Sequence, residues 1–393
     1  MLGVDDFSRF YSEVHGEPPF PWQADLVDEV LSRREWPELI DVPTGMGKTA
    51  LLDVAVFVAA ATAAESGDRR LGRRRTFLVV DRRIVVDEAY DRAGRLSEAL
   101  ERGAAASTDS AVRRVADGLR ALAPKVGEPL AIPPAVPVPQ RPRRLLPVTR
   151  MRGGVTWDAA WLDRPDIPGV IVGTVDQLGS RLLFRGYGVS DRRKPIDAAL
   201  VGADSLVLVD EAHLAEVMVS TVMAVQGRDT AGIGVPRAVL VRMTATAGSE
   251  RLRRYAINID RHRDSPVAWR RLTASKRLSL VSSDPKQVVT AMAAQAVALL
   301  GGAHDTALVV CNTVERARQV HAALAKATTG RRALDADVSL LIGRCRPIDR
   351  DVLVAGLQKR FGVGRERRRV AGRPCSWRPR PSRWARTLMS TGS

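Results

Sequence analysis

Short apolar runs alternate with longer helical segments over the first two thirds of the chain. A helical segment rich in Ala, Leu and Val covers 49–64, and a polar or glycine-bearing loop follows each apolar run. The runs predicted as buried strands are 39–42, 76–80, 169–172, 206–209 and 238–243. Alternating strands and helices predict an α/β fold with a parallel sheet covered by helices. Ligands of such sheets bind outside the carboxyl ends of the strands, so the loops after these runs are candidate sites.

A second α/β unit is expected in the last third of the chain. Strands are predicted at 306–310 and 340–342, and Asn312 with Glu315 three residues later predicts the start of a helix that runs through Leu324. The segment between the two units, from about residue 247 to 278, is basic and irregular and predicts no element. The expected organisation is a first domain at 1–265, a partial second domain at 275–373 and a basic tail at 374–393.

A proline-rich insertion interrupts the first domain. The segment 124–147 contains eight prolines and the basic cluster Arg141, Arg143 and Arg144. Such a composition predicts an extended surface segment instead of core. Two readings remain open for it, a solvated spacer and a nucleic-acid contact.

Composition narrows the class of protein. A chain of 393 residues with 45% hydrophobic and 27% charged residues can bury sizeable cores and suggests two or three domains. No uncharged apolar stretch is long enough to predict a membrane span, and the N-terminus does not resemble a secretory signal. Cys311, Cys345 and Cys375 are odd in number and far apart, which favours a reducing cytoplasm over a disulfide framework.

The formal net charge of +17 favours a polyanionic partner. This charge is unevenly distributed, because 363–393 contains nine Arg and one Glu. About half of the excess positive charge therefore lies in a short C-terminal segment.

The strongest candidate site is the sequence Asp-Val-Pro-Thr-Gly-Met-Gly-Lys-Thr at 41–49. A strand, a glycine loop and a helix N-terminus place backbone N–H groups and the helix dipole around phosphates. Lys48 is expected to reach the β- and γ-phosphates of ATP, and the Thr49 hydroxyl to ligate Mg²⁺. The residues expected to bind ATP in this loop are Thr44, Gly45, Met46, Gly47, Lys48 and Thr49. The alternative is an ordinary glycine turn beside an exposed lysine.

A second candidate site is the sequence Asp-Glu-Ala-His at 210–213, which directly follows an apolar run. A carboxylate at the end of a parallel strand beside a phosphate loop can hold Mg²⁺, and a second one can orient the attacking water. We expect Asp210 to bind the metal and Glu211 to be the catalytic base, with Lys48 as its catalytic partner. The alternative is a solvated acidic pair.

Two further segments resemble motifs of superfamily 2 helicases. Thr244-Ala-Thr246 resembles the Ser/Thr-Ala-Thr element that couples hydrolysis to movement in these proteins, and the resemblance assigns His213 to the same coupling. Gln23, in Pro-Phe-Pro-Trp-Gln at 19–23, resembles the glutamine of these helicases that reads adenine.

The resemblance is more specific to the helicase part of the type I CRISPR-associated helicase-nuclease. Three segments carry it: 79–87 (Val-Val-Asp-Arg-Arg-Ile-Val-Val-Asp), 172–178 (Val-Gly-Thr-Val-Asp-Gln-Leu) and 343–351 (Gly-Arg-Cys-Arg-Pro-Ile-Asp-Arg-Asp). It implies two RecA-like domains, the second incomplete, and ATP- and Mg²⁺-dependent translocation on DNA during CRISPR interference in the cytoplasm. It also implies a CRISPR effector complex as partner and sequence-independent contacts to single-stranded DNA. The expected DNA contacts are Arg82, Arg83, Thr174 and Gln177.

Several parts of that family are expected to be missing. The chain has five histidines, and His304-Asp305 alone does not predict the metal-binding nuclease domain. The late motifs of the second domain, which include an arginine finger, are not found, so at most weak ATP turnover is expected. The alternatives are an inactive ATP- and DNA-binding fragment and another superfamily 2 motor, such as a restriction-type translocase.

The last twenty residues, 374–393, show neither apolar periodicity nor helix caps. One choice of codons for them, read from the third base, encodes an apolar strand followed by a Thr-Gln-Thr, Gly and Asp loop that resembles the missing motif. We therefore expect a one-base frameshift near Pro374. The alternative is a native basic tail that binds nucleic acid.

Overall fold

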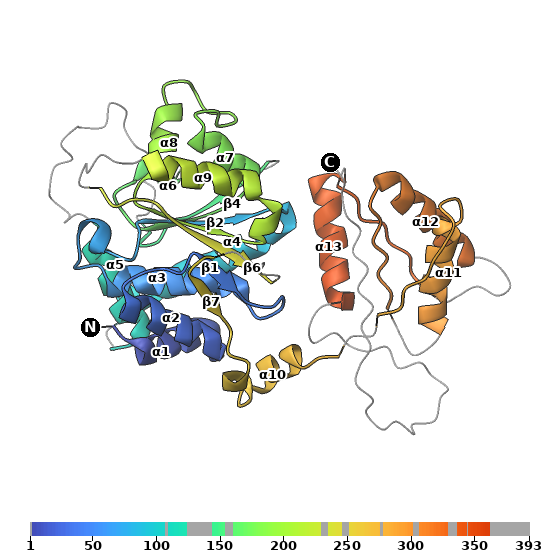
Figure 1. Ribbon diagram of the computed structural model, residues 1–393, viewed down its shortest axis with the longest axis horizontal. Helices are drawn as coiled ribbons and strands as arrows, with labels where there is room; N and C mark the ends of the chain where they lie inside the picture. The colour runs from blue at the N-terminus through green and yellow to red at the C-terminus, as the bar shows by residue number, and fades with distance from the viewer. Residues whose placement is uncertain are drawn as a thin grey trace. The chain divides into compact units, whose positions relative to one another are not determined.

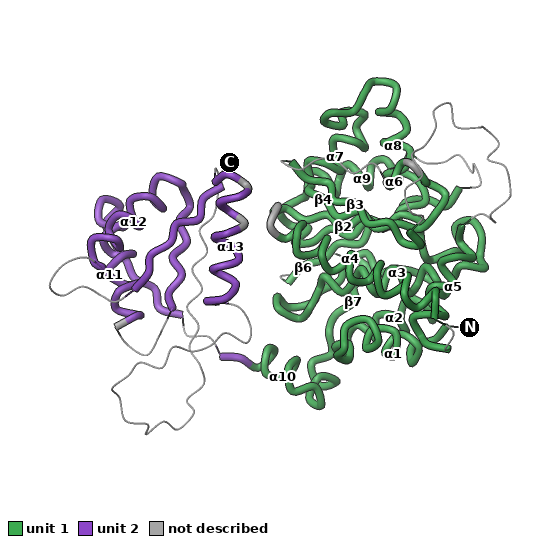
Figure 2. Tube along the Cα trace, turned by 180° about the vertical axis from the view of Figure 1, so that it is seen from behind, with its two compact units in different colours: residues 1–273 green, residues 274–393 purple. Residues whose placement is uncertain are grey.

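The chain forms two compact units, residues 1–273 and residues 274–393 (Figure 2). The computed structural model describes residues 2–106, 109–123, 144–153, 160–228, 235–245, 251–275, 278–301, 306–328, 336–343 and 345–361. Residues 124–143 of the proline-rich segment and the residues 362–393 lie outside the described part, as do the frameshift expected near Pro374 and the His304-Asp305 pair.

Unit 1 contains a sheet of seven strands in the order β3-β4-β2-β5-β6-β1-β7 (Figure 1). All neighbouring strands are parallel. The strands are β1 (Leu39–Asp41), β2 (Arg75–Val80), β3 (Val148–Met151), β4 (Gly169–Thr174), β5 (Ser205–Val209), β6 (Val239–Thr244) and β7 (Arg254–Ala256). Parallel order and covering helices confirm the predicted α/β class.

Helices cover both faces of this sheet (Figure 1). On one face are α1 (Val4–His15), α2 (Pro21–Arg33), α3 (Leu51–Ala61), α4 (Arg83–Ala105) and α5 (Ala111–Leu122). On the other are α6 (Ala160–Asp163), α7 (Val175–Leu182), α8 (Lys194–Gly202) and α9 (Glu216–Arg228). Side chains alternate along each strand, so Leu78 packs in the first core while Phe77 and Val79 pack in the second. Burial on both faces explains why the strands are continuous apolar runs.

The connection from the sheet to unit 2 is more regular than the sequence predicts. The stretch predicted as irregular, 247–278, contains β7, a short 3-10 turn at Asp260–His262 and α10 (Pro266–Leu272). β7 was missed because only three residues pair with β1, and the basic residue Arg254 begins it. Its strand conformation depends on that pairing, which no local pattern reveals.

Unit 2 has three helices among its described residues, α11 (Val288–Gly301), α12 (Val314–Ala327) and α13 (Pro347–Phe361). The prediction of strands at 306–310 and 340–342 was wrong, because neither run pairs with another strand among the described residues. Their side chains nevertheless pack with α11 and α12 around Cys311 and Val320. Local apolarity predicted burial correctly, but a strand also needs a hydrogen-bonded neighbour.

Two helices begin at other residues than the sequence predicted. The expected helix 49–64 divides into a 3-10 turn at Lys48–Ala50 and α3. α12 is capped by Thr313 and not by Asn312, since the Thr313 hydroxyl accepts a hydrogen bond from the backbone N–H of Arg316 at 3.2 Å. A side-chain acceptor three residues before a free N–H is what an N-cap needs, and Thr313 has that spacing.

Candidate nucleotide-binding site

The glycine loop follows β1 and leads through the Lys48–Ala50 turn into α3. Gly45 and Gly47 have φ angles of 89° and 74°, which are conformations that side chains disfavour. A Cβ on Gly47 would also lie 3.2 Å from the Gln23 amide nitrogen and 3.3 Å from the Phe20 ring. Thr44 is exposed, Thr49 is half-buried and Met46 is buried. The loop therefore needs its two glycines for backbone shape and, at Gly47, for space.

The start of α2 packs directly against this loop. The Gln23 side-chain Oε1 accepts a hydrogen bond from Phe20 N at 3.0 Å, and its Nε2 donates to Gly47 O at 3.3 Å. The Trp22 indole N–H donates to Met46 O at 2.8 Å. Gln23 is 1% exposed and fixes the loop in this structure. Its expected contact with adenine stays a prediction.

Lys48 joins the loop to the carboxylates after β5. Its Nζ donates to Glu211 Oε1 at 2.7 Å and lies 3.7 Å from Asp210 Oδ1. β6 separates β1 from β5 in the sheet, so residues more than 160 positions apart meet across one strand. The two sequence motifs thus form one cluster at the carboxyl edge of the sheet.

The acidic pair is held in a defined geometry. Asp210 N donates to Val79 O at 2.9 Å, which extends the β5–β2 pairing by one residue. Glu211 then adopts a left-handed conformation with φ 48°, and its N–H donates to Asp210 Oδ1 at 3.1 Å. His213 Nδ1 lies 3.7 Å from Glu211 Oε2. A glutamate in this conformation is uncommon and marks a position where the fold overrides local preference.

Burial raises the pKa of Asp210 above its usual value, and the neighbouring Glu211 charge acts in the same direction, while Lys48 lowers it. A half-buried carboxylate without full compensation gains from a bound cation. The oxygen donors present, the Asp210 carboxylate and the Thr49 hydroxyl, are of the kind that Mg²⁺ prefers. The chemistry of this donor set therefore fits that ion.

The other candidate residues lie at the ends of β6, β2 and β4. Thr244 is buried, and its carbonyl accepts the Val42 N–H at 3.1 Å, whereas Thr246 lies outside the described residues. Arg82 is exposed at the start of α4, and the side chain of Arg83 is outside the described part. Thr244 and Arg82 thus lie at the edge of the sheet that carries the glycine loop.

Thr174 and Gln177 begin α7 and are each 7% exposed. The Gln177 carbonyl oxygen accepts a hydrogen bond from Arg181 Nη1 at 2.8 Å. This contact orients Gln177 along its own helix. The DNA contacts expected of both residues stay predictions.

Arg271 is a contact that the sequence reading missed. It comes from α10, and its Nη1 donates to Gly45 O, with its guanidinium carbon 5.5 Å from the centre of the Phe20 ring. Tyr255 supports the same region, since its hydroxyl donates to Trp22 O at 2.8 Å. Only the chain path through β7 brings these residues to the loop, and no spacing in the sequence could have indicated it.

A RecA-like α/β unit with a glycine loop facing strand-end carboxylates defines the class of fold. The solved structures with a similar fold include the DEAD-box helicase Mss116 bound to ssRNA and UDP-BeF (TM-score 0.54, 12% identity, covering 91% of this chain and 64% of that chain). Mss116p with NTE and C-tail double deletion, bound to ssRNA and AMP-PNP, gives a TM-score of 0.53 at 12% identity, again covering 91% and 64%. The chain thus spans less than two thirds of these structures.

A more distant likeness is to the Mycobacterium smegmatis helicase Lhr bound to ssDNA and AMP-PNP, with a TM-score of 0.46 and 15% identity over 90% of this chain and 40% of that one. No protein-family model matches the sequence, and no curated protein matches it either. Within the described residues, no helix is both long and apolar enough to cross a membrane.

Proposed function

We propose that this chain is the ATP-binding part of a superfamily 2 motor that hydrolyses ATP and acts on nucleic acid. The observation that carries the proposal is the contact of Lys48 with both Glu211 and Asp210. A single cation from the glycine loop after β1 faces two carboxylates that follow β5, one strand further along the sheet. That combination suits phosphoryl transfer, in which positioning and charge stabilisation provide most of the catalysis.

Each residue has a separate part in the proposed reaction. The backbone N–H groups of the loop and the Lys48 ammonium bind the phosphates, which compete with Glu211 for that ammonium. Thr49 and Asp210 would hold Mg²⁺, and the chemistry that the ion would supply there is charge neutralisation at the phosphates. Glu211 then orients the attacking water and accepts its proton.

Coupling of hydrolysis to movement is proposed to use the strand between these motifs. β6 lies between β1 and β5, and its last residue, Thr244, is bonded to the glycine loop through Val42. His213 comes two residues after Glu211, and its Nδ1 lies 3.7 Å from the Glu211 carboxylate. A change at the phosphates can therefore reach Thr244 and His213 through adjacent backbone, and Thr246 is proposed to take part in the same coupling.

We further propose that this motor is the helicase of type I CRISPR interference. In this proposal it acts on single-stranded DNA in the cytoplasm together with a CRISPR effector complex. The sequence resemblance at 79–87 and 172–178 supports it. Arg82, Arg83, Thr174 and Gln177 are the proposed DNA contacts. Exposed Arg82 is suited to a phosphate, which would fix register without reading sequence.

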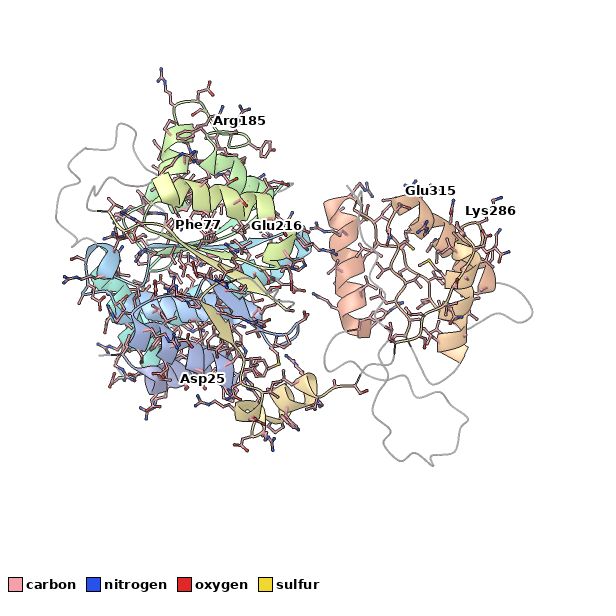
Figure 3. The ribbon with its side chains drawn as sticks, viewed as in Figure 1. Asp25, Phe77, Arg185, Glu216, Lys286 and Glu315 are labelled. Carbon is pink, nitrogen blue, oxygen red and sulfur yellow. The ribbon has the colours of Figure 1, made fainter. Side chains whose placement is uncertain are left out.

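Replacing Lys48 tests the nucleotide site. Lys48→Ala removes the cation that faces the phosphates, so ATP affinity should fall by about tenfold or more. Titration of a fluorescent ATP analogue, with Mg²⁺ present, measures this in the full chain. Lys286→Ala, an exposed lysine of unit 2 (Figure 3), is the matched control and should bind as the wild type does. ATP affinity that survives Lys48→Ala within about twofold would refute the assignment.

A further inference from the structure

The loop between α7 and α8 exposes an unusual pair of aromatic side chains. Phe184 is 56% exposed and Tyr187 is 58% exposed. Aromatic rings are large apolar groups that folded proteins usually bury at least in part. The loop projects from the helix layer formed by α7, α8 and α9 (Figure 1), and neither the nucleotide site nor its proposed mechanism uses it.

The exposed residue Phe184 has a backbone conformation that is unfavourable for a residue with a side chain. Its N–H donates to Arg181 O at 3.0 Å, and the next N–H, that of Arg185, donates to Ser180 O at 2.6 Å. This pair of bonds is the Schellman ending of a helix, in which the residue equivalent to Phe184 is usually Gly. Phe184 has a φ of 60°, a conformation that glycine adopts without strain. Helix termination alone therefore favours a different residue at this position.

The loop has defined internal contacts although its rings are exposed. Val189 N donates to Gly186 O at 3.3 Å, and a Cβ on Gly186 would lie 2.9 Å from Val189 Cγ2. Beneath it, Arg181 Nε and Asp197 Oδ2 lie 3.2 Å apart with both side chains almost fully buried. A preformed loop loses little conformational entropy when it binds a partner.

Positive charge accompanies the two rings. The segment 183–196 has four cationic residues and one acid, Asp191, whose carboxylate contacts Lys194 at 2.7 Å. Arg185 and Arg192 are exposed, and neither has an ion pair among the residues that the structure describes. Arg185 lies at the outer end of unit 1 (Figure 3). The loop therefore offers flat rings and cations on the same surface.

We propose that the loop 183–193 is a stacking platform for single-stranded nucleic acid, with Phe184 and Tyr187 against bases and Arg185 and Arg192 against phosphates. A single strand of nucleic acid offers aromatic bases and regularly spaced negative charge, which match both kinds of side chain at once. Base–aromatic stacking and basic side chains are the usual elements of sequence-independent single-strand binding. The site shares the nucleic-acid partner of the proposed function, but it requires neither ATP nor Lys48.

Substitution of Phe184 by Gly separates binding from folding. Phe184→Gly should raise the thermal midpoint by about 1–4 °C, because glycine suits the left-handed position. The same variant should bind a labelled oligo(dT) of about 15 nucleotides roughly 5- to 100-fold more weakly. Fluorescence anisotropy without nucleotide measures the affinity in the full chain. A more stable protein that binds more weakly is the expected result.

Tyr187 provides the independent variant. Tyr187→Ala should weaken oligo(dT) binding to a similar degree, while Tyr187→Phe, which keeps the ring, should restore it. Ile259→Ala replaces an apolar side chain of similar exposure, 51%, elsewhere in unit 1 and should leave binding unchanged. Unchanged affinity in both Phe184→Gly and Tyr187→Ala would overturn the proposal, and so would an equal loss in Ile259→Ala.

Two other outcomes would also count against the platform. A wild-type chain that does not bind oligo(dT) overturns it, even if ATP binding persists. If Phe184→Gly abolishes capture of a protein partner but not oligo(dT) binding, the loop is a protein-docking surface instead. Failure of ATP binding alone refutes the proposed function and leaves this proposal standing, because the assay contains no nucleotide.

Discussion

Glu211 combines a strained backbone with a contact to the glycine-loop lysine. Its φ of 48° costs on the order of 1–3 kcal/mol, and the N–H bond to Asp210 helps to hold it. In return the carboxylate faces Lys48 Nζ at 2.7 Å. The strained residue is the one proposed to orient water. Its conformation therefore serves the proposed chemistry at a cost in stability.

The first residue-scale prediction is that Glu211→Gln keeps ATP binding and removes turnover. The amide keeps the size and shape of the carboxylate but cannot accept the proton of water, so the hydrolysis rate should fall by about 10²–10⁴-fold. Phosphate release with single-stranded DNA present measures the rate. Glu216→Gln, an exposed glutamate at the start of α9 (Figure 3), should behave like the wild type. Loss of ATP binding in Glu211→Gln would contradict the division of roles.

Arg271 gives a second prediction at this scale. Arg271→Ala removes the donor to Gly45 O and the cation over Phe20, so ATP affinity should fall by about 3- to 10-fold. The effect should be smaller than that of Lys48→Ala, since the loop keeps its bonds to α2. Arg270→Ala on the same helix is the matched control. An equal loss in the control would mean that α10 acts through its overall charge.

At the scale of elements, α3 is anchored through Asp53, which lies in its first turn. The fully buried Asp53 carboxylate contacts His15 Nε2 of α1 at 2.7 Å and accepts a hydrogen bond from Arg92 Nε of α4 at 2.8 Å. Arg92 also donates to the Tyr11 hydroxyl at 3.1 Å. Three helices on one face of the sheet therefore meet at one carboxylate.

Asp53→Ala should therefore destabilise unit 1 strongly. Removing one partner of a buried ion pair leaves the Arg92 charge uncompensated and costs about 3–5 kcal/mol. Denaturant unfolding at pH 7 measures the change. Asp91→Ala, an exposed aspartate next to Arg92, should change the unfolding free energy by no more than about 0.5 kcal/mol. A similar small change in Asp53→Ala would show that the cluster contributes little.

For the whole molecule, the two hydrophobic cores of the sheet contain residues of unit 1 alone. The residues around the glycine loop, from Phe20 to Arg271, also belong to this unit. We therefore predict that a fragment of residues 1–273 folds cooperatively and binds ATP within about threefold of the full chain. Thermal unfolding and nucleotide titration check both statements. A fragment that aggregates or loses ATP affinity would show that unit 2 supports unit 1.

The strands buried on both faces of the sheet were predictable from local sequence. The runs 76–80 and 206–209 predicted β2 and β5 because a strand buried on both faces is apolar at every position. The alternation of such runs with helices predicted the α/β class, which is confirmed. Both candidate motifs were found from local spacing, since a glycine loop or a strand-end carboxylate pair is contiguous in the chain.

The missed elements have little local signal. β3 and β7 are short strands at the edges of the sheet, and β7 forms only by pairing with β1. The run 306–310 shows the opposite error. It was predicted as a strand because it is apolar, but it has no paired neighbour among the described residues. Strand formation is a property of two segments, and one segment cannot specify it.

By itself the sequence determined the fold class, the glycine loop and the candidate chemistry of Lys48, Asp210 and Glu211. Only the tertiary structure decided that Lys48 reaches Glu211 across β6, that Gln23 is bonded to the loop, and that Arg271 lies over Phe20. It also decided that Phe184 stands exposed in a left-handed position. Backbone preference and apolar periodicity act between near neighbours in the chain. Contacts between distant segments depend instead on the spatial order of the strands in the sheet.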